Sequence, residues 1–153
     1  DILAMTGKLG RGIVWEKDRT NTERLLRIEP RVKEGKALAQ TGAVTSCIDI
    51  SDGLSTCLHL LSKASGVGFT VAEEQVPMDA CLRKGERERA LHWGGDFELL
   101  FTVRPDKVGE LDSIKGITVI GVATEGQNIY LDMEGKLEFL PDRGYEHFGR
   151  GAW

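Results

Sequence analysis

Cysteine and long apolar runs are scarce in this sequence, and each scarcity excludes a class of protein. The 153 residues include four prolines and three cysteines. Cys47, Cys57 and Cys81 show no C-x-x-C spacing, so they predict neither a disulfide framework nor a zinc site, and reduced thiols in the cytoplasm are the simpler interpretation. No apolar run approaches the ~20 residues that a membrane-spanning helix needs, so we expect no membrane partner.

A surplus of basic residues is also lacking. The formal net charge is −4, which argues against a protein that binds nucleic acid through its phosphate backbone. An acidic chain can still bind a nucleotide, because metal ions bridge carboxylates to phosphates. Hydrophobic residues make up 41% and charged residues 29%, proportions that are ordinary for a soluble globular domain. The length and the absence of internal repeats predict one domain over residues 1–153.

Apolar periodicity switches along the chain between that of strands and that of helices. Residues 44–48 alternate loosely, whereas Leu54, Leu58 and Leu61 recur at helical spacing. Because strands and helices alternate and a hairpin follows, we predict an α/β or α+β fold, a mixed β-sheet layered with helices. The predicted strands are 1–5, 44–48, 69–72, 97–103, 118–123, 128–133 and 136–139, and the predicted helices are 32–40, 54–65, 79–90 and 105–113, with shorter ones around Val14 and Leu26.

Two aspartates bracket the junction between strand 44–48 and helix 54–65. Asp49 follows the strand directly, and Asp52 lies near the amino end of the helix. Ligands of open α/β sheets bind at such strand ends, and the first turn of a helix offers unpaired N–H groups to a phosphate. The two carboxylates, with the Ser51 hydroxyl between them, can hold a hydrated Mg²⁺ against that phosphate. The alternative is structural: Asp52 is the helix N-cap and Asp49 is a turn residue.

A second polar cluster is the run Gly94-Gly95-Asp96-Phe97-Glu98, which leads into an apolar strand. Paired glycines permit positive φ, and consecutive N–H groups in such a turn can form a concavity for an anion. The alternative interpretation is a tight turn with two solvated acids.

Together these motifs resemble the second domain of thiamine-monophosphate kinases, within the family of enzymes like aminoimidazole ribonucleotide synthetase. The resemblance rests on the order and spacing of motifs across most of the chain. They are Thr6-Gly7-x-Leu9-Gly10, Asp49-Ile50-Ser51-Asp52-Gly53-Leu54, Ser65-Gly66-Val67-Gly68, Gly94-Gly95-Asp96-Phe97-Glu98-Leu99-Leu100-Phe101-Thr102 and Gly144-Tyr145-Glu146-His147-Phe148.

The resemblance implies the C-terminal domain of that fold and a Mg²⁺-dependent transfer of phosphate from ATP to thiamine monophosphate, which gives thiamine diphosphate. It implies that Asp49 and Asp52 bind the metal and that Ser51 contacts the nucleotide. It also implies that Gly95, Asp96 and Tyr145 lie near the thiamine substrate. No catalytic residue is assigned, because phosphoryl transfer depends mainly on positioning and on charge neutralisation.

The sequence departs from this family in two respects. The family usually has Gly-Gly-Glu-Asp-aromatic-Glu, and the segment here is one residue shorter, so the first carboxylate is missing. Members also carry an amino-terminal domain with further metal-binding acids and much of the dimer interface, which these 153 residues do not supply. We therefore expect the C-terminal domain of a longer, homodimeric kinase, inactive when isolated. The alternatives are another ATP-dependent enzyme of the superfamily and a non-catalytic binding or assembly module.

Overall fold

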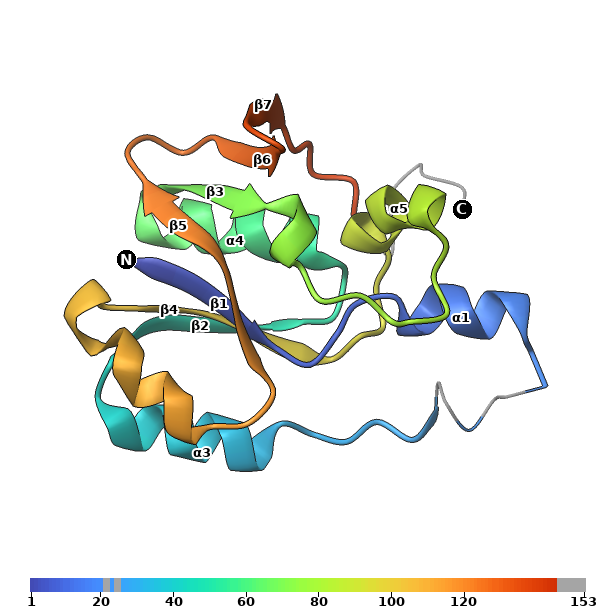
Figure 1. The fold of residues 1–153 in the computed structure, drawn as a ribbon, viewed down its shortest axis with the longest axis horizontal. Coiled ribbons are helices and arrows are strands. Elements are labelled where there is room, and N and C mark those ends of the chain that lie inside the picture. Colours follow the sequence, from blue (N-terminus) through green and yellow to red (C-terminus); the bar gives the residue numbers. More distant parts are fainter. Residues whose placement is uncertain (21–22, 24–25, 146–153) are drawn as a thin grey trace.

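One mixed sheet organises the chain (Figure 1). The computed structural model describes residues 1–20, 23 and 26–145, and within them seven strands pair in the order β2-β4-β1-β5-β3-β6-β7. All neighbours are antiparallel except β3 and β6, which are parallel, so the predicted mixed sheet is confirmed. The strands are β1 (Ile2–Thr6), β2 (Val44–Ile50), β3 (Gly68–Ala72), β4 (Glu98–Val103), β5 (Ile117–Thr124), β6 (Ile129–Met133) and β7 (Lys136–Phe139).

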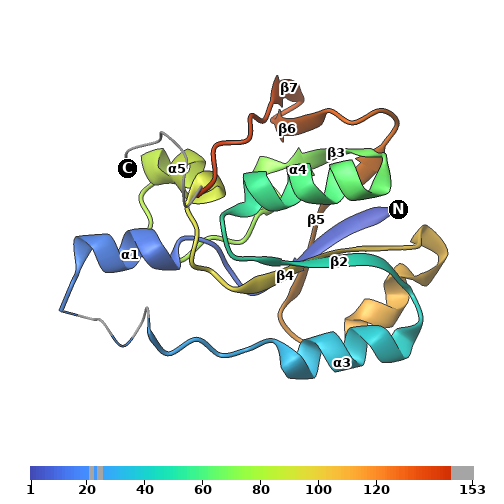
Figure 2. The same cartoon turned by 180° about the vertical axis from the view of Figure 1, so that it is seen from behind.

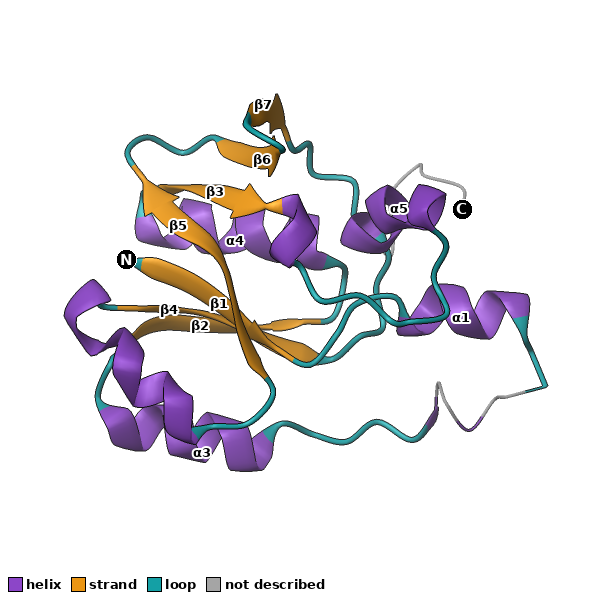
Figure 3. Cartoon of the chain, viewed as in Figure 1, coloured by secondary structure: helices purple, strands orange, loops and turns teal. Residues whose placement is uncertain are grey.

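Helices cover both faces of this sheet (Figures 1 and 2). In both views α4 (Leu54–Ser65) lies on one side of β1, β2 and β4, while α3 (Val32–Thr41) and the 3-10 helix η3 (Pro105–Ser113) lie on the other. Two shorter helices, α1 (Arg11–Lys17) and α5 (Arg87–His92), lie at the end of the sheet remote from the N-terminus (Figure 3). None of the helices in the described part of the chain is long and apolar enough to span a bilayer.

Each face has its own apolar core, and β1 contributes to both because successive side chains of a strand point to opposite faces. Leu3 and Met5 of β1 belong to the larger core, which contains Leu54, Leu58 and Leu61 of α4. Ala4 belongs to the smaller core, which includes Leu38 of α3, Phe101 of β4 and Leu111 of η3. This burial explains the helical spacing in 54–65, whose apolar face covers the sheet.

Glycines end α3 and α4. Gly42 and Gly66 take the left-handed conformation, with φ of 60° and 71°, and the N–H of each bonds back to a carbonyl of its helix. Glycine adopts this conformation without the steric cost that a β-carbon adds.

The helix predicted over 79–90 is wrong across its first half. Asp79 accepts a hydrogen bond from the backbone N–H of Cys81 (2.9 Å) instead, and a 3-10 turn at Lys84–Glu86 precedes α5. An aspartate that bonds the backbone two residues ahead favours a turn over a helix. The strand predicted from residue 97 starts at Glu98, because Phe97 has a φ of 55°. The short helix predicted around Leu26 falls partly outside the described residues.

Candidate functional site

Three loops meet where β2 ends and β4 begins: the turn after β2, the Gly-Gly turn before β4, and the segment 142–145. The backbone N–H of Gly95 donates to the carbonyl of Ser51 (2.8 Å), and that of Tyr145 donates to the carbonyl of Asp52 (2.9 Å). The turn that contains Ser51 and Asp52 is therefore bonded to the two other motifs, although these lie more than 40 residues further along the chain. Asp49 precedes this turn and lies within β2, where it pairs with Leu99, so the alternative that it is a turn residue is wrong.

Glycine is required where these loops touch. A β-carbon on Gly53 would lie 2.5 Å from the carbonyl oxygen of His92, and one on Gly94 would lie 2.5 Å from the carbonyl oxygen of Ser51. Gly53 also has a φ of 100° and is the N-cap of α4, without any side-chain capping bond. The interpretation of Asp52 as the N-cap is therefore wrong, and the Asp52 carboxylate is left available for a ligand.

The meeting loops enclose a cavity of about 320 Å³. It brings together four of the six predicted site residues, Ser51, Asp52, Gly95 and Tyr145, and adds two aromatic side chains that the sequence analysis missed. These are Trp93 and Phe97, and their positions on either side of Gly94-Gly95 in the sequence could have indicated them. The full lining is Ser51, Asp52, Trp93, Gly94, Gly95, Phe97 and Tyr145.

Asp49 does not line this cavity. Its charge and that of Asp52 nevertheless both act on the thiol of Cys57, in the first turn of α4. Burial, together with the charges of Asp49 and Asp52, raises the pKa of the Cys57 thiol to about 11. The thiol also donates to the backbone carbonyl of Asp49 (3.1 Å). Cys57 is therefore a packed thiol, and the two carboxylates flank the first turn of α4.

The described residues do not by themselves make up a metal site. Among the described residues, no group of three or more His, Cys, Asp or Glu side chains is placed to hold a metal ion. Two carboxylates nevertheless suit Mg²⁺, which commonly binds to proteins through one or two of them and completes its shell with water and phosphate oxygens. Asp49 and Asp52 fit that description, and Ser51 donates a hydrogen bond to Asp52 (3.2 Å).

Asp96, the sixth predicted site residue, is buried (3% exposed) and does not line the cavity. Its Oδ1 accepts hydrogen bonds from the backbone N–H groups of Gly10 and Arg11, both at 2.9 Å. Its Oδ2 has no partner among the described residues. Desolvation raises the pKa of Asp96 to about 7 against the opposing effect of those two hydrogen bonds. Asp96 thus ties the Gly-Gly turn to the start of α1.

Glu98 is buried as well and forms an ion pair with Arg31. The guanidinium donates through Nε to Oε2 (2.7 Å) and through a second nitrogen to Oε1 (2.8 Å), while the Thr6 hydroxyl donates to Oε2 (2.6 Å). Hydrogen bonding to Glu98 raises the pKa of Arg31. The interpretation of Asp96 and Glu98 as solvated acids is therefore wrong, and neither residue lines the cavity.

Known proteins resemble this chain in sequence and in fold. The model of the family "AIR synthase related protein, C-terminal domain" matches residues 7–134. A thiamine-monophosphate kinase of Pyrococcus horikoshii is 32% identical over 162 residues, an alignment that covers 100% of this chain and 52% of that protein. The predicted resemblance to thiamine-monophosphate kinases is confirmed. The chain spans about half the length of the curated relatives it matches.

Two solved structures agree with the sequence comparison. The crystal structure of a thiamine-monophosphate kinase from Stenotrophomonas maltophilia K279a matches with a TM-score of 0.75 and 26% identity, over 86% of this chain and 50% of that one. A protein called AaThiL, in complex with AMPPCP and TMP, matches with a TM-score of 0.76 and 27% identity, over 97% of this chain and 51% of that one. The fold is therefore shared with proteins about twice as long.

Proposed function

This chain belongs to the family of AIR synthase related proteins, as their C-terminal domain, and from that membership we propose that it is half of an ATP-dependent kinase that phosphorylates thiamine monophosphate. The observation that carries this proposal is the cavity that joins Ser51 and Asp52 to Gly95 and Tyr145. It is supported by the names of the relatives and by the bound AMPPCP, an ATP analogue, and TMP of one structural neighbour.

The cavity walls have the chemistry that a thiamine ring requires. Trp93, Phe97 and Tyr145 present aromatic groups, and Asp52 adds a carboxylate. The thiazolium ring of thiamine is cationic, and such a cation is stabilised by aromatic faces and by a nearby negative charge. In this proposal the ring lies among the aromatic side chains, and the open side of Gly95, where a β-carbon would meet nothing within 4 Å, leaves room for it.

The nucleotide lies beside Asp49, Ser51 and Asp52 in this proposal. Mg²⁺ bound there would neutralise phosphate charge, which is the main requirement of phosphoryl transfer. Ser51 contacts the nucleotide and the two carboxylates hold the ion, with the remaining ligands coming from phosphate, water and the half that the relatives have in addition. We also propose that the full-length protein is a homodimer in the cytoplasm and that this chain alone is inactive.

The test is calorimetric titration of the chain with thiamine monophosphate and, separately, with ATP in the presence of Mg²⁺. We expect weak binding of both ligands. The double variant Asp49→Asn/Asp52→Asn should lower the nucleotide affinity at least tenfold, because two hard oxygen ligands are lost. The control Asp106→Asn/Asp112→Asn removes the same charge on the exposed helix η3 and should leave both titrations unchanged.

Three results separate the possibilities. Binding of the nucleotide without thiamine monophosphate would favour another ATP-dependent enzyme of the superfamily. Binding of thiamine monophosphate that is unaffected by Mg-ATP would favour a non-catalytic binding module. Thiamine diphosphate formed by the purified chain alone would contradict the assignment of a half-site.

A further inference from the structure

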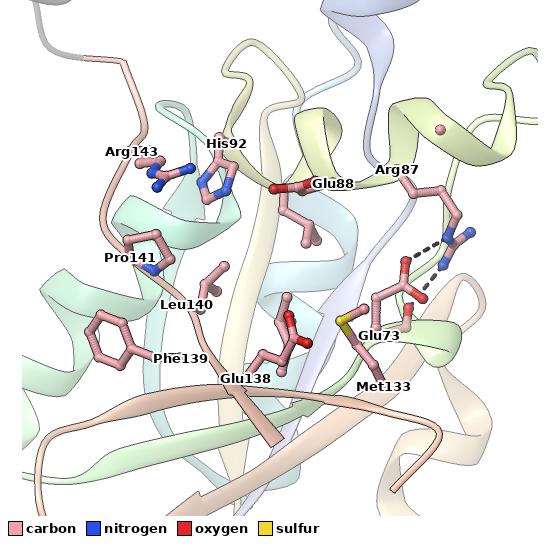
Figure 4. Close-up of a pocket in the computed structure, with 13 residues that line it drawn as sticks. Glu73, Arg87, Glu88, His92, Met133, Glu138, Phe139, Leu140, Pro141 and Arg143 are labelled. Carbon is pink, nitrogen blue, oxygen red and sulfur yellow. Dashed lines mark hydrogen bonds and ion pairs between the residues drawn. The ribbon is translucent and has the colours of Figure 1, made fainter. Parts of the chain in front are cut away.

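A second and larger cavity, of about 610 Å³, lies between α5, the hairpin β6–β7 and the segment 140–143 (Figure 4). It shares no lining residue with the cavity around Ser51 and Asp52. Its volume is that of an ordinary small-molecule site.

The floor of this second cavity is apolar. Leu91, Leu131 and Leu140 are buried beneath it, while Met133 and Phe139 stand at its rim with 43% and 56% of their surface exposed. Large apolar side chains that gather around a concave surface commonly mark a binding site. The charged and hydrogen-bonding groups around these apolar side chains determine which class of small molecule can bind.

Most charges around the cavity are already paired. Arg87 donates to Glu73 (2.7 Å) and to two backbone carbonyls, and Lys136 donates to Glu138 (2.5 Å). Two charges remain. Among the described residues, neither Glu88 nor Arg143 has a hydrogen bond or an ion pair.

His92 lies between these two residues in Figure 4, and the charges of both influence its pKa. Burial lowers its pKa and the charge of Arg143 lowers it further, while the charges of Glu88 and of Asp142, which lies outside the cavity lining and accepts a hydrogen bond from Thr56, oppose that effect. Its Nδ1 is hydrogen-bonded to the Ser55 hydroxyl (2.8 Å), which fixes the ring. The imidazole is therefore neutral at pH 7, and the cavity presents one free positive and one free negative group on either side of it.

We propose that this cavity binds a small zwitterion with an apolar side group, of the class of aromatic amino acids, whose carboxylate pairs with Arg143 and whose ammonium group pairs with Glu88. The apolar group lies on Leu91, Leu131 and Leu140, against the exposed faces of Met133 and Phe139. This assignment goes beyond the proposed kinase function and does not depend on it.

The charge balance selects the zwitterion over simpler ligands. An anion alone pairs with Arg143 but brings its charge near Glu88, and a cation alone meets the reverse problem. A molecule with both groups pairs with each, and complementary charges determine selectivity between ligands of similar shape.

The second cavity is adjacent in sequence to the first. Trp93 directly follows His92, and Tyr145 comes two residues after Arg143. A ligand held between His92 and Arg143 therefore contacts the two segments that carry Trp93 and Tyr145, which line the cavity around Ser51 and Asp52.

The test uses three probes with the same phenyl group: phenylalanine, 3-phenylpropanoate and 2-phenylethylamine. Each is titrated into the ¹⁵N-labelled chain while amide chemical shifts are followed. We expect phenylalanine to shift the amides of Leu131, Phe139 and Leu140 with an affinity at least about fivefold above that of either other probe, because it alone pairs with both charges. Equal affinity for the acid or the amine would overturn the zwitterion, and the absence of shifts at those amides would overturn the site.

Two variants assign the charges. Arg143→Gln should weaken phenylalanine and phenylpropanoate but not phenylethylamine, and Glu88→Gln should weaken phenylalanine and phenylethylamine but not phenylpropanoate. The controls Glu74→Gln and Arg27→Gln remove exposed charges outside the cavity and should change none of the three. Loss of all three probes to the same extent in both variants would contradict the charge assignment. The comparison of probes on the unaltered chain is valid whether or not a variant folds.

Discussion

At the scale of single residues, Asp96 shows how burial alters the role of a carboxylate. The resemblance placed this residue near the substrate, and that assignment remains a prediction. In the structure Asp96 is 3% exposed and accepts two backbone hydrogen bonds from residues about 85 positions earlier in the chain. A pairing over that distance leaves no local pattern in the sequence, which is why the spacing of Gly-Gly-Asp did not reveal it.

The pKa of Asp96 gives a prediction about stability. Because the pKa is raised from 3.8 to about 7, the folded state favours the neutral carboxyl, so its stabilisation is complete below about pH 4 and is lost as the pH rises through 7. This loss is at most about 1.4 kcal/mol per pH unit. The variant Asp96→Asn should therefore gain free energy of unfolding relative to the unaltered chain between about pH 5 and pH 7, as measured by urea denaturation.

The control for this experiment is Asp112→Asn, on the exposed surface of η3, whose difference from the unaltered chain should not vary with pH. A difference for Asp96→Asn that is also constant over this range would show that Asp96 stays ionised in the folded protein.

At the scale of elements, the turns before α4 and before β4 depend on glycine for separable reasons. Gly53 has a φ of 100° and no space for a β-carbon, whereas Gly95 has a φ of 93° and open space around it. We predict that Gly95→Ala costs about 1 kcal/mol, from backbone strain alone. Gly53→Ala should cost about 3 kcal/mol or more, because the overlap with the His92 carbonyl adds to the strain.

Thermal unfolding of both variants measures this difference. Equal losses of stability would mean that the contact between the Asp-Gly turn and the end of α5 is loose, and the cavity between them would then lack a fixed shape.

The ion pair of Arg31 with Glu98 docks the start of α3 against β4. Removing the partly exposed Arg31 leaves the buried carboxylate of Glu98 without its ion-pair partner, so Arg31→Gln should destabilise the fold by about 3 kcal/mol. The pair of Arg27 with Glu23 is 80% and 74% exposed, and Arg27→Gln should cost less than about 0.5 kcal/mol. Urea denaturation of the two variants gives the comparison, and similar costs would contradict a structural role for the buried pair.

At the scale of the whole molecule, local periodicity predicted the fold better than it predicted the site. Strands such as 44–48 and the helix 54–65 were found because their apolar residues follow the period of the element. The helix 79–90 was wrong because Asp79 and Gly85 favour turns. The site was found in outline from its glycines and acids. Arg31, Trp93 and Phe97 were missed, since their roles arise from contacts between segments far apart in the chain.

The central claim is that these loops form half of the active site of a thiamine-monophosphate kinase. The most direct measurement is the rate of thiamine diphosphate formation by a chimaera, in which this chain replaces the segment of the Pyrococcus horikoshii enzyme that it aligns with. We predict that the chimaera forms thiamine diphosphate from ATP and thiamine monophosphate, and that Asp52→Asn lowers the rate at least tenfold. A folded chimaera that binds Mg-ATP and forms no product, or one that is equally active with Asp52→Asn, would contradict the claim.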